Sequence, residues 1–131
     1  MSTLAQADLP AADHAGSAAR NIAVIDIGSN SIRMVLFRLE GRALFPMFNE
    51  KTMAGLGRGA GETGLLNPEG VAAAIRTLKR FRTLLDAKQV TERHAVATAA
   101  VRATTDGPAF VERVREECGL EIRVLSGEEE G

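Results

Sequence analysis

Two groups of residues in this chain have types and spacings that could do phosphate chemistry. The first is the segment Asp26-Ile27-Gly28-Ser29-Asn30-Ser31-Ile32-Arg33, in which a carboxylate stands one residue before a glycine turn. The backbone N–H groups of such a turn, the hydroxyls of Ser29 and Ser31, and a carboxylate that can hold a hydrated cation suit a metal-bound phosphate. A simpler interpretation also fits, because an aspartate before a turn often accepts hydrogen bonds from the turn's own amides.

Asp26 is also the one carboxylate in the apolar run Ile22–Ile27. A run this apolar is typical of a strand that is buried on both faces of a sheet, where an unpaired carboxylate costs free energy. We therefore expect Asp26 to meet a partner at the end of its strand.

The second group is the run Ser126-Gly127-Glu128-Glu129-Glu130 at the end of the chain. Ser126 and Glu129 have the spacing of a capping box, which predicts the start of a helix, and Glu128 suits the positive end of the helix dipole. Glu130 is rotated about the helix axis by about a further 100° from Glu129 and has no role in capping the helix, so its carboxylate is free for chemistry. The alternative is that all three acids only stabilise a helix start.

These groups depend on a set of strands that the first half of the sequence predicts. Residues 22–27, 32–39 and 44–53 read as strands, and the polar turn after residue 27 and the Glu40-Gly41 turn separate them, which indicates three antiparallel strands. Pro46 lacks an N–H group, so the third strand should lie at an edge of the sheet.

Two helices and two further strands follow. Asn67-Pro68-Glu69 opens a long amphipathic helix, residues 94–98 predict a fourth strand, Asp106-Gly107-Pro108 opens a helix that ends at Gly119, and residues 121–125 predict a fifth strand. Strands joined through helices imply parallel pairing. The sequence therefore predicts an α/β fold, a five-stranded mixed sheet with helices packed on it and the element order βββαβαβ of a ribonuclease-H-like lobe.

Composition excludes several classes of function. With 131 residues, 16 basic and 17 acidic side chains and a formal charge of -1, the chain has no overall positive field for nucleic acid or an anionic membrane. Its single cysteine, Cys118, is expected to pack in the core and excludes a disulfide framework. Residues 1–20 predict a disordered leader without a secretory signal, so we expect a cytoplasmic protein whose ordered part begins near Asn21.

The segment Gly59–Gly64 fits the dinucleotide-binding fingerprint letter by letter. That signature requires a strand directly before it and a helix that opens on its last glycine, whereas the predicted helix cap comes later, at Asn67. With Gly55 and Gly57 nearby, the segment predicts a flexible loop that can border an active cleft.

Together with Ala97-Thr98-Ala99-Ala100-Val101-Arg102, the two groups resemble, in order and separation, the exopolyphosphatase/guanosine pentaphosphate phosphatase family. The resemblance covers about residues 21–131. It implies membership of the sugar kinase, Hsp70 and actin superfamily, in which two ribonuclease-H-like lobes enclose a phosphate-binding cleft. Residues 21–131 would be the first lobe, truncated at the start of its last helix.

The resemblance also implies roles for individual residues. Asp26 would position a magnesium ion through water, and Glu130 would be the general base that deprotonates the water attacking a terminal phosphorus. Such hydrolysis needs an aligned water, a base, and cations that offset charge. The phosphate-binding residues that it implies are Gly28, Ser29, Asn30, Ser31, Arg33 and Arg102.

Two departures from the family pattern are visible. Gly55 stands where family members often carry a basic residue ahead of Leu56-Gly57. The family's second phosphate loop would lie beyond Gly131, so we expect this fragment alone to hydrolyse polyphosphate weakly or not at all.

The expected function is therefore the release of terminal phosphate from inorganic polyphosphate or guanosine pentaphosphate, between which the residues do not choose. The alternatives are an ATP-dependent kinase or ATPase of the same superfamily and a non-catalytic alarmone-binding module. For the full-length form we expect a homodimer and no nucleic-acid partner, although the residues themselves do not give an oligomeric state.

Overall fold

Five strands form a single mixed sheet in the computed structural model, which describes residues 19–130, with only the backbone of Glu129 and Glu130. The strand order is β3-β2-β1-β4-β5. β1 pairs antiparallel with β2, and β2 with β3, whereas β1–β4 and β4–β5 are parallel. The strands are β1 (Arg20–Ile27), β2 (Ile32–Glu40), β3 (Ala43–Thr52), β4 (Glu92–Ala97) and β5 (Ile122–Val124), and the helices are α1 (Ala60–Thr63), α2 (Pro68–Ala87), α3 (Ala99–Ala103), α4 (Gly107–Cys118) and α5 (Gly127–Glu130).

This arrangement confirms the predicted mixed sheet and the positions of its five strands. β3 lies at an edge, as Pro46 predicted, and the ladder between β2 and β3 shifts between Leu36 and Phe37. Most of the leader expected over residues 1–20 falls outside the described residues, and β1 begins at Arg20. Within the described part, no helix is long and apolar enough to cross a membrane.

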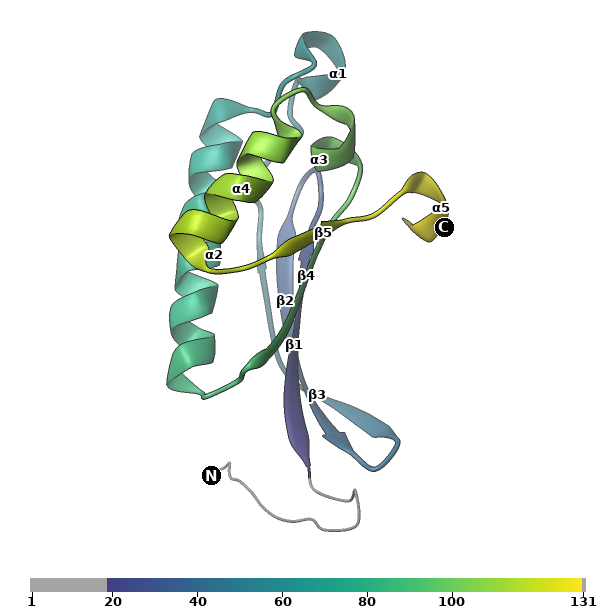
Figure 1. Ribbon diagram of the computed structural model, residues 1–131, viewed down its shortest axis with the longest axis vertical. Helices are drawn as coiled ribbons and strands as arrows, with labels where there is room; N and C mark the ends of the chain where they lie inside the picture. The colour runs from purple at the N-terminus through teal and green to yellow at the C-terminus, as the bar shows by residue number, and fades with distance from the viewer. Residues whose placement is uncertain (1–18, 131) are drawn as a thin grey trace.

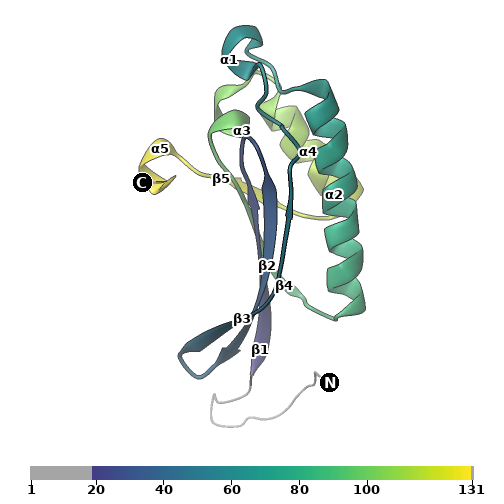
Figure 2. The same cartoon turned by 180° about the vertical axis from the view of Figure 1, so that it is seen from behind.

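The long helices α2 and α4 cover one face of the sheet, and α5 lies beyond the other face (Figures 1 and 2). Ala23, Ile25 and Ile27 of β1 are buried on the helix side. Asp26, between the last two, is exposed on the opposite face. The expectation that β1 is buried on both faces is therefore wrong for the described residues, and the Asp26 carboxylate stands in solvent without the predicted burial penalty.

Helix α2 begins as its sequence predicts. The Asn67 side chain accepts a hydrogen bond from Gly70 N at 2.8 Å, and Pro68 occupies the first turn. Gly70 lies so close to the preceding loop that an added Cβ would be 2.6 Å from the Gly55 carbonyl oxygen. One stripe of the helix is buried against the sheet and α4, at Gly70, Ala74, Ile75, Thr77, Leu78, Phe81 and Leu85.

Helix α4 also matches its prediction at both ends, since Gly119 ends it with a φ of 67°. Asp106, however, does not cap it. Its carboxylate accepts a hydrogen bond from Leu66 N at 2.9 Å and so ties the start of α4 to the loop before α2. Cys118 is fully buried, as expected of a packing residue, and burial raises the pKa of its thiol.

Two short helices, α1 and α3, were not predicted. Gly59 and Gly64, with φ of 76° and 73°, flank α1, so the segment predicted as a flexible loop contains one helical turn. Helix α3 is held by the buried Thr104 hydroxyl, which donates to the Ala100 carbonyl at 2.7 Å. One helical turn is too short to show a 3.6-residue period, so neither could be found from the pattern.

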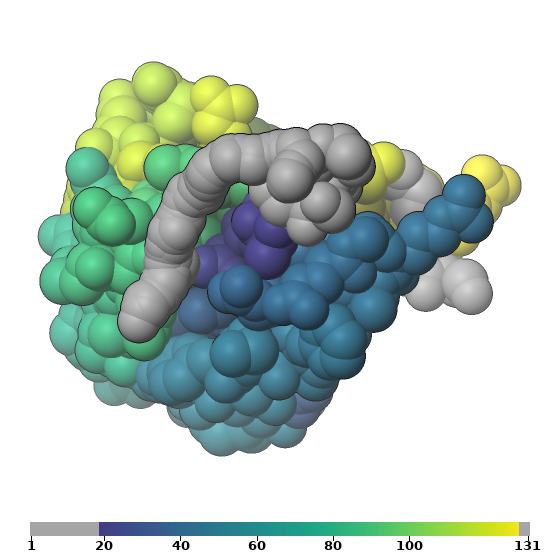
Figure 3. Space-filling view, turned by 90° about the horizontal axis from the view of Figure 1, so that it is seen from below, coloured from purple at the N-terminus to yellow at the C-terminus, as the bar shows by residue number. Residues whose placement is uncertain are grey.

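The far end of the β2–β3 hairpin projects beyond the helix-covered body (Figure 3). Its tip carries three exposed apolar side chains, Leu44, Phe45 and Met47. They lie outside the buried core, so the tip contributes little to the stability of the fold.

Candidate active site

The carboxyl ends of the parallel strands bring the three candidate segments to one edge of the sheet (Figure 1). Thr98 N donates to the Ile27 carbonyl at 3.2 Å, and Leu125 N donates to the Ala97 carbonyl at 2.9 Å. The β1–β2 turn, the start of α3 and the chain that enters α5 are therefore neighbours. In open α/β sheets this edge is where ligands bind.

The β1–β2 turn is closed by a hydrogen bond from Gly28 N to the Ser31 carbonyl at 2.9 Å. Ser29 and Ser31 are partly buried, whereas Asn30 is exposed. Among the residues that the structure describes, the Asp26 carboxylate accepts no hydrogen bond and forms no ion pair. The simpler interpretation, in which Asp26 is occupied by the turn amides, is therefore not what the structure shows.

The glycine loop after β3 contacts this turn through Gly55 and Gly57, whereas a border between residues 59–64 and an active cleft stays a prediction. Gly57 N donates to the Ser29 carbonyl at 2.8 Å, and Gly55 N donates to the Asn30 carbonyl at 2.9 Å. A Cβ at Gly57 would lie 3.0 Å from Ser29 Cβ and 3.1 Å from Ala100 Cβ. Gly57 therefore lets the loop, the turn and the start of α3 meet.

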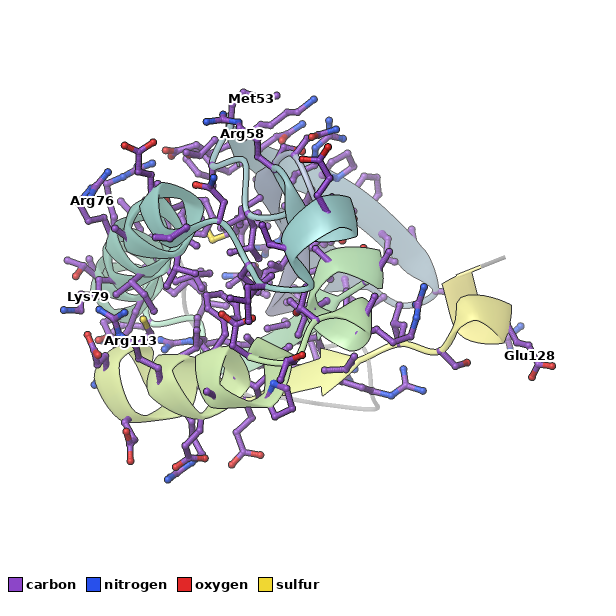
Figure 4. All side chains as sticks on the ribbon, turned by 90° about the horizontal axis from the view of Figure 1, so that it is seen from above. Met53, Arg58, Arg76, Lys79, Arg113 and Glu128 are labelled. Atoms are coloured by element: carbon purple, nitrogen blue, oxygen red, sulfur yellow. The ribbon has the colours of Figure 1, made fainter. Side chains whose placement is uncertain are left out.

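Gly55 has no side chain of its own at the position where the family resemblance implies a basic residue, but the guanidinium of Arg58 lies next to it. Its φ is 72°, and an added Cβ would be 2.7 Å from Arg58 Nη2. Arg58 is exposed and belongs to the loop that follows β3 (Figure 4). The guanidinium of Arg58 thus occupies the space that a side chain at position 55 would enter.

Asp26 and Arg33 lie directly opposite each other in the antiparallel ladder of β1 and β2. Opposite residues project from the same face, so both belong to the face that α2 and α4 leave uncovered. Both are exposed. The structure therefore brings these two predicted site residues together at the foot of the serine-lined turn.

Arg102 reaches the same edge from α3. Its Nη1 donates to the Leu125 carbonyl at 2.8 Å, which ties α3 to the chain entering α5. This structural contact was not predicted, because it joins residues 23 positions apart. Binding of phosphate by Arg102 stays a prediction.

Helix α5 begins at Gly127, where the sequence predicted a helix start. The side chains of Glu129 and Glu130 lie outside the described residues, so the capping box and the role of Glu130 as a base stay predictions. Glu128 is exposed and points away from the body of the molecule (Figure 4). It is therefore not part of the candidate site.

Asp26 is the carboxylate that the described side chains offer to a divalent cation beside the serine-lined turn. Among the described side chains, which end at Glu128, no three His, Cys, Asp or Glu residues form a cluster that could hold a metal ion. Asp26 nevertheless fits magnesium, which keeps several waters and binds through one or two carboxylates plus substrate phosphates. A single exposed carboxylate beside a serine-lined turn suits that mode of binding.

Known proteins of one phosphatase family are similar to this chain. Residues 35–131 match the model of the Ppx/GppA phosphatase family. Exopolyphosphatase 1 of Mycobacterium tuberculosis is 29% identical over 110 residues, which are 83% of this chain and 32% of the relative. The crystal structure of the Aquifex aeolicus Ppx/GppA family member is similar with a TM-score of 0.83 and 33% identity, over 87% of this chain and 37% of that one.

An exopolyphosphatase from Cytophaga hutchinsonii is similar with a TM-score of 0.78 and 30% identity, over 83% of this chain and 35% of that one. The chain thus spans about a third of the length of these three proteins. The family model covers most of its residues. The chain therefore belongs to the Ppx/GppA phosphatase family.

Proposed function

We propose that the full-length protein, meaning the natural polypeptide that contains this chain, hydrolyses phosphoanhydride bonds and releases terminal phosphate from inorganic polyphosphate or guanosine pentaphosphate. The observation that carries the proposal is the convergence of the serine-lined turn, the opposed Asp26 and Arg33, and Arg102 at one sheet edge. Membership of a phosphatase family supports it.

In this proposal each group of the chain has a separate role in binding or catalysis. The turn amides and serine hydroxyls bind phosphate oxygens, Arg33 and Arg102 offset negative charge, and Glu130 accepts the proton of the attacking water. Asp26 would hold magnesium through water, at a place where the ion would supply Lewis acidity toward the phosphate oxygens. Cations fixed before the reaction stabilise the charge that shifts toward the leaving oxygen.

Phosphate release by the full-length protein tests this proposal. We expect release from polyphosphate, guanosine pentaphosphate or both, which stops when EDTA removes magnesium and returns when magnesium is added. Orthophosphate should appear without a phosphate acceptor. Transfer to an acceptor with ADP as product would show a kinase instead, and binding without turnover would show a non-catalytic module.

The chain by itself is expected to release phosphate far more slowly than the full-length protein. It covers about a third of its relatives' length, and in this proposal it supplies one wall of the two-lobed cleft that the family resemblance implies. Measuring magnesium-dependent release at equal molar concentration of both forms checks this expectation. Equal rates would mean that the described lobe contains the whole active site.

A further inference from the structure

A row of three charged residues crosses the uncovered face of the sheet. The register places Lys51 of β3 opposite Arg33 of β2, and Arg33 opposite Asp26 of β1. Directly opposite residues project from the same face, so all three belong to the face of the candidate site. All three are exposed. Lys51 is two strands from Asp26, roughly 10 Å at the ~4.8 Å spacing of neighbouring strands.

This row contains two like charges that directly face each other. Like charges opposite one another destabilise a sheet. Within the described residues, neither Lys51 nor Arg33 forms an ion pair, whereas Arg20 pairs with Glu92 at 3.1 Å and Lys79 with Glu117 at 3.3 Å. The row therefore holds two cations against the one carboxylate of Asp26, which leaves one positive charge on the uncovered face that the row does not balance.

The irregularity in the ladder creates this pairing. From Glu40↔Ala43 to Phe37↔Pro46 the two strands pair without a break, and a continued register would place Glu50 opposite Arg33. The shift between Leu36 and Phe37 instead moves Lys51 into that position. Glu50 then turns to the helix side, where it forms an ion pair with Arg80 of α2. A regular hairpin would have paired opposite charges.

We propose that Lys51 and Arg33 together bind an anionic group of the substrate, namely a phosphate further along the chain than the one that is cleaved. This inference rests on the proposed function and adds Lys51 to the site. A multi-phosphate chain is the matching ligand, because it carries negative charge over the distance that separates Lys51 from Asp26. Inorganic polyphosphate and the phosphates of a guanosine nucleotide share this chemistry, so both are used as test substrates.

The test is Lys51→Gln in the full-length protein, with Arg76→Gln as the matched control. Arg76 is an exposed cation on α2, on the helix-covered side (Figure 4), so its loss changes the net charge equally and leaves the site intact. We expect Lys51→Gln to raise KM by about three- to tenfold with kcat within about twofold. Lys51→Arg should restore KM. Arg76→Gln should leave both constants unchanged.

Two further measurements separate this inference from the proposed function. Binding of tripolyphosphate, measured by isothermal titration calorimetry, needs no turnover and should weaken by the same factor in Lys51→Gln. The ligand-free Lys51→Gln protein should unfold at a slightly higher temperature, because the repulsion with Arg33 is removed. If the wild-type protein releases no phosphate, the proposed function is refuted. The role of Lys51 is then tested by comparing the calorimetric affinity for tripolyphosphate of the wild type and Lys51→Gln. If Lys51→Gln has the same KM and the same tripolyphosphate affinity as Arg76→Gln, the role of Lys51 is refuted. The proposed function is not affected by that result.

Discussion

Replacing Glu130 with Gln in the full-length protein is expected to lower the rate of phosphate release by about 10²- to 10⁴-fold, the contribution of a positioned general base. The amide has nearly the size of the carboxylate but does not accept a proton from the attacking water. Substrate affinity should stay within a few-fold, since the turn and the arginines still bind phosphate. Single-turnover kinetics together with equilibrium binding of tripolyphosphate measure the two quantities separately.

Glu128→Gln is the matched control for this prediction. Residues two positions apart on a helix differ by about 200° in direction, and Glu128 points away from the body of the molecule (Figure 4). Its substitution removes the same charge from the same short helix and should leave turnover within about twofold. An equal loss of activity in both variants would mean that the acidic run acts through helix stability. Full activity of the Glu130→Gln variant would show that Glu130 is not the general base.

The fold could be predicted from the sequence where a local signal marks an element's end. Pro46 placed β3 at an edge, the Asn67-Pro68 pair marked the start of α2, and Gly119 marked the end of α4. Helices α1 and α3 have no such signal. They depend on contacts made only in the folded chain, such as the Thr104 hydroxyl bond in α3.

The candidate site likewise contains some residues that the sequence predicts and others that depend on the folded structure. Asp26, the serine-lined turn and Arg33 are close in sequence, so one segment predicts that they lie together. Lys51 could not be found in this way, because its place opposite Arg33 depends on the shift in the ladder near Leu36. A one-residue change of register sends every later side chain to the other face. The exposure of Asp26 was missed because a strand's apolar content does not show whether one or both faces are covered.

A second large effect is expected from Gly107→Ala, this time on stability. Gly107 is the first residue of α4, and it is buried against α3. An added Cβ would be 2.0 Å from the Val101 carbonyl oxygen and 3.1 Å from Thr104 Oγ1. Backbone cannot move aside as a flexible side chain can, so α3 and α4 must separate. We expect a loss of about 2–3 kcal/mol in the free energy of unfolding, the upper part of the range for overpacked cores.

Gly61→Ala is the control, because Gly61 lies in α1 and an added Cβ would meet nothing within 4 Å. That variant should be as stable as the wild type or up to about 1 kcal/mol more stable, since alanine favours a helix. Chemical denaturation of the full-length variants measures both changes. Because α3 carries Arg102, whose guanidinium bonds the Leu125 carbonyl, Gly107→Ala should also weaken tripolyphosphate binding at temperatures where the protein remains folded. Unchanged binding in a destabilised Gly107→Ala protein would show that the position of α3 does not control the phosphate site.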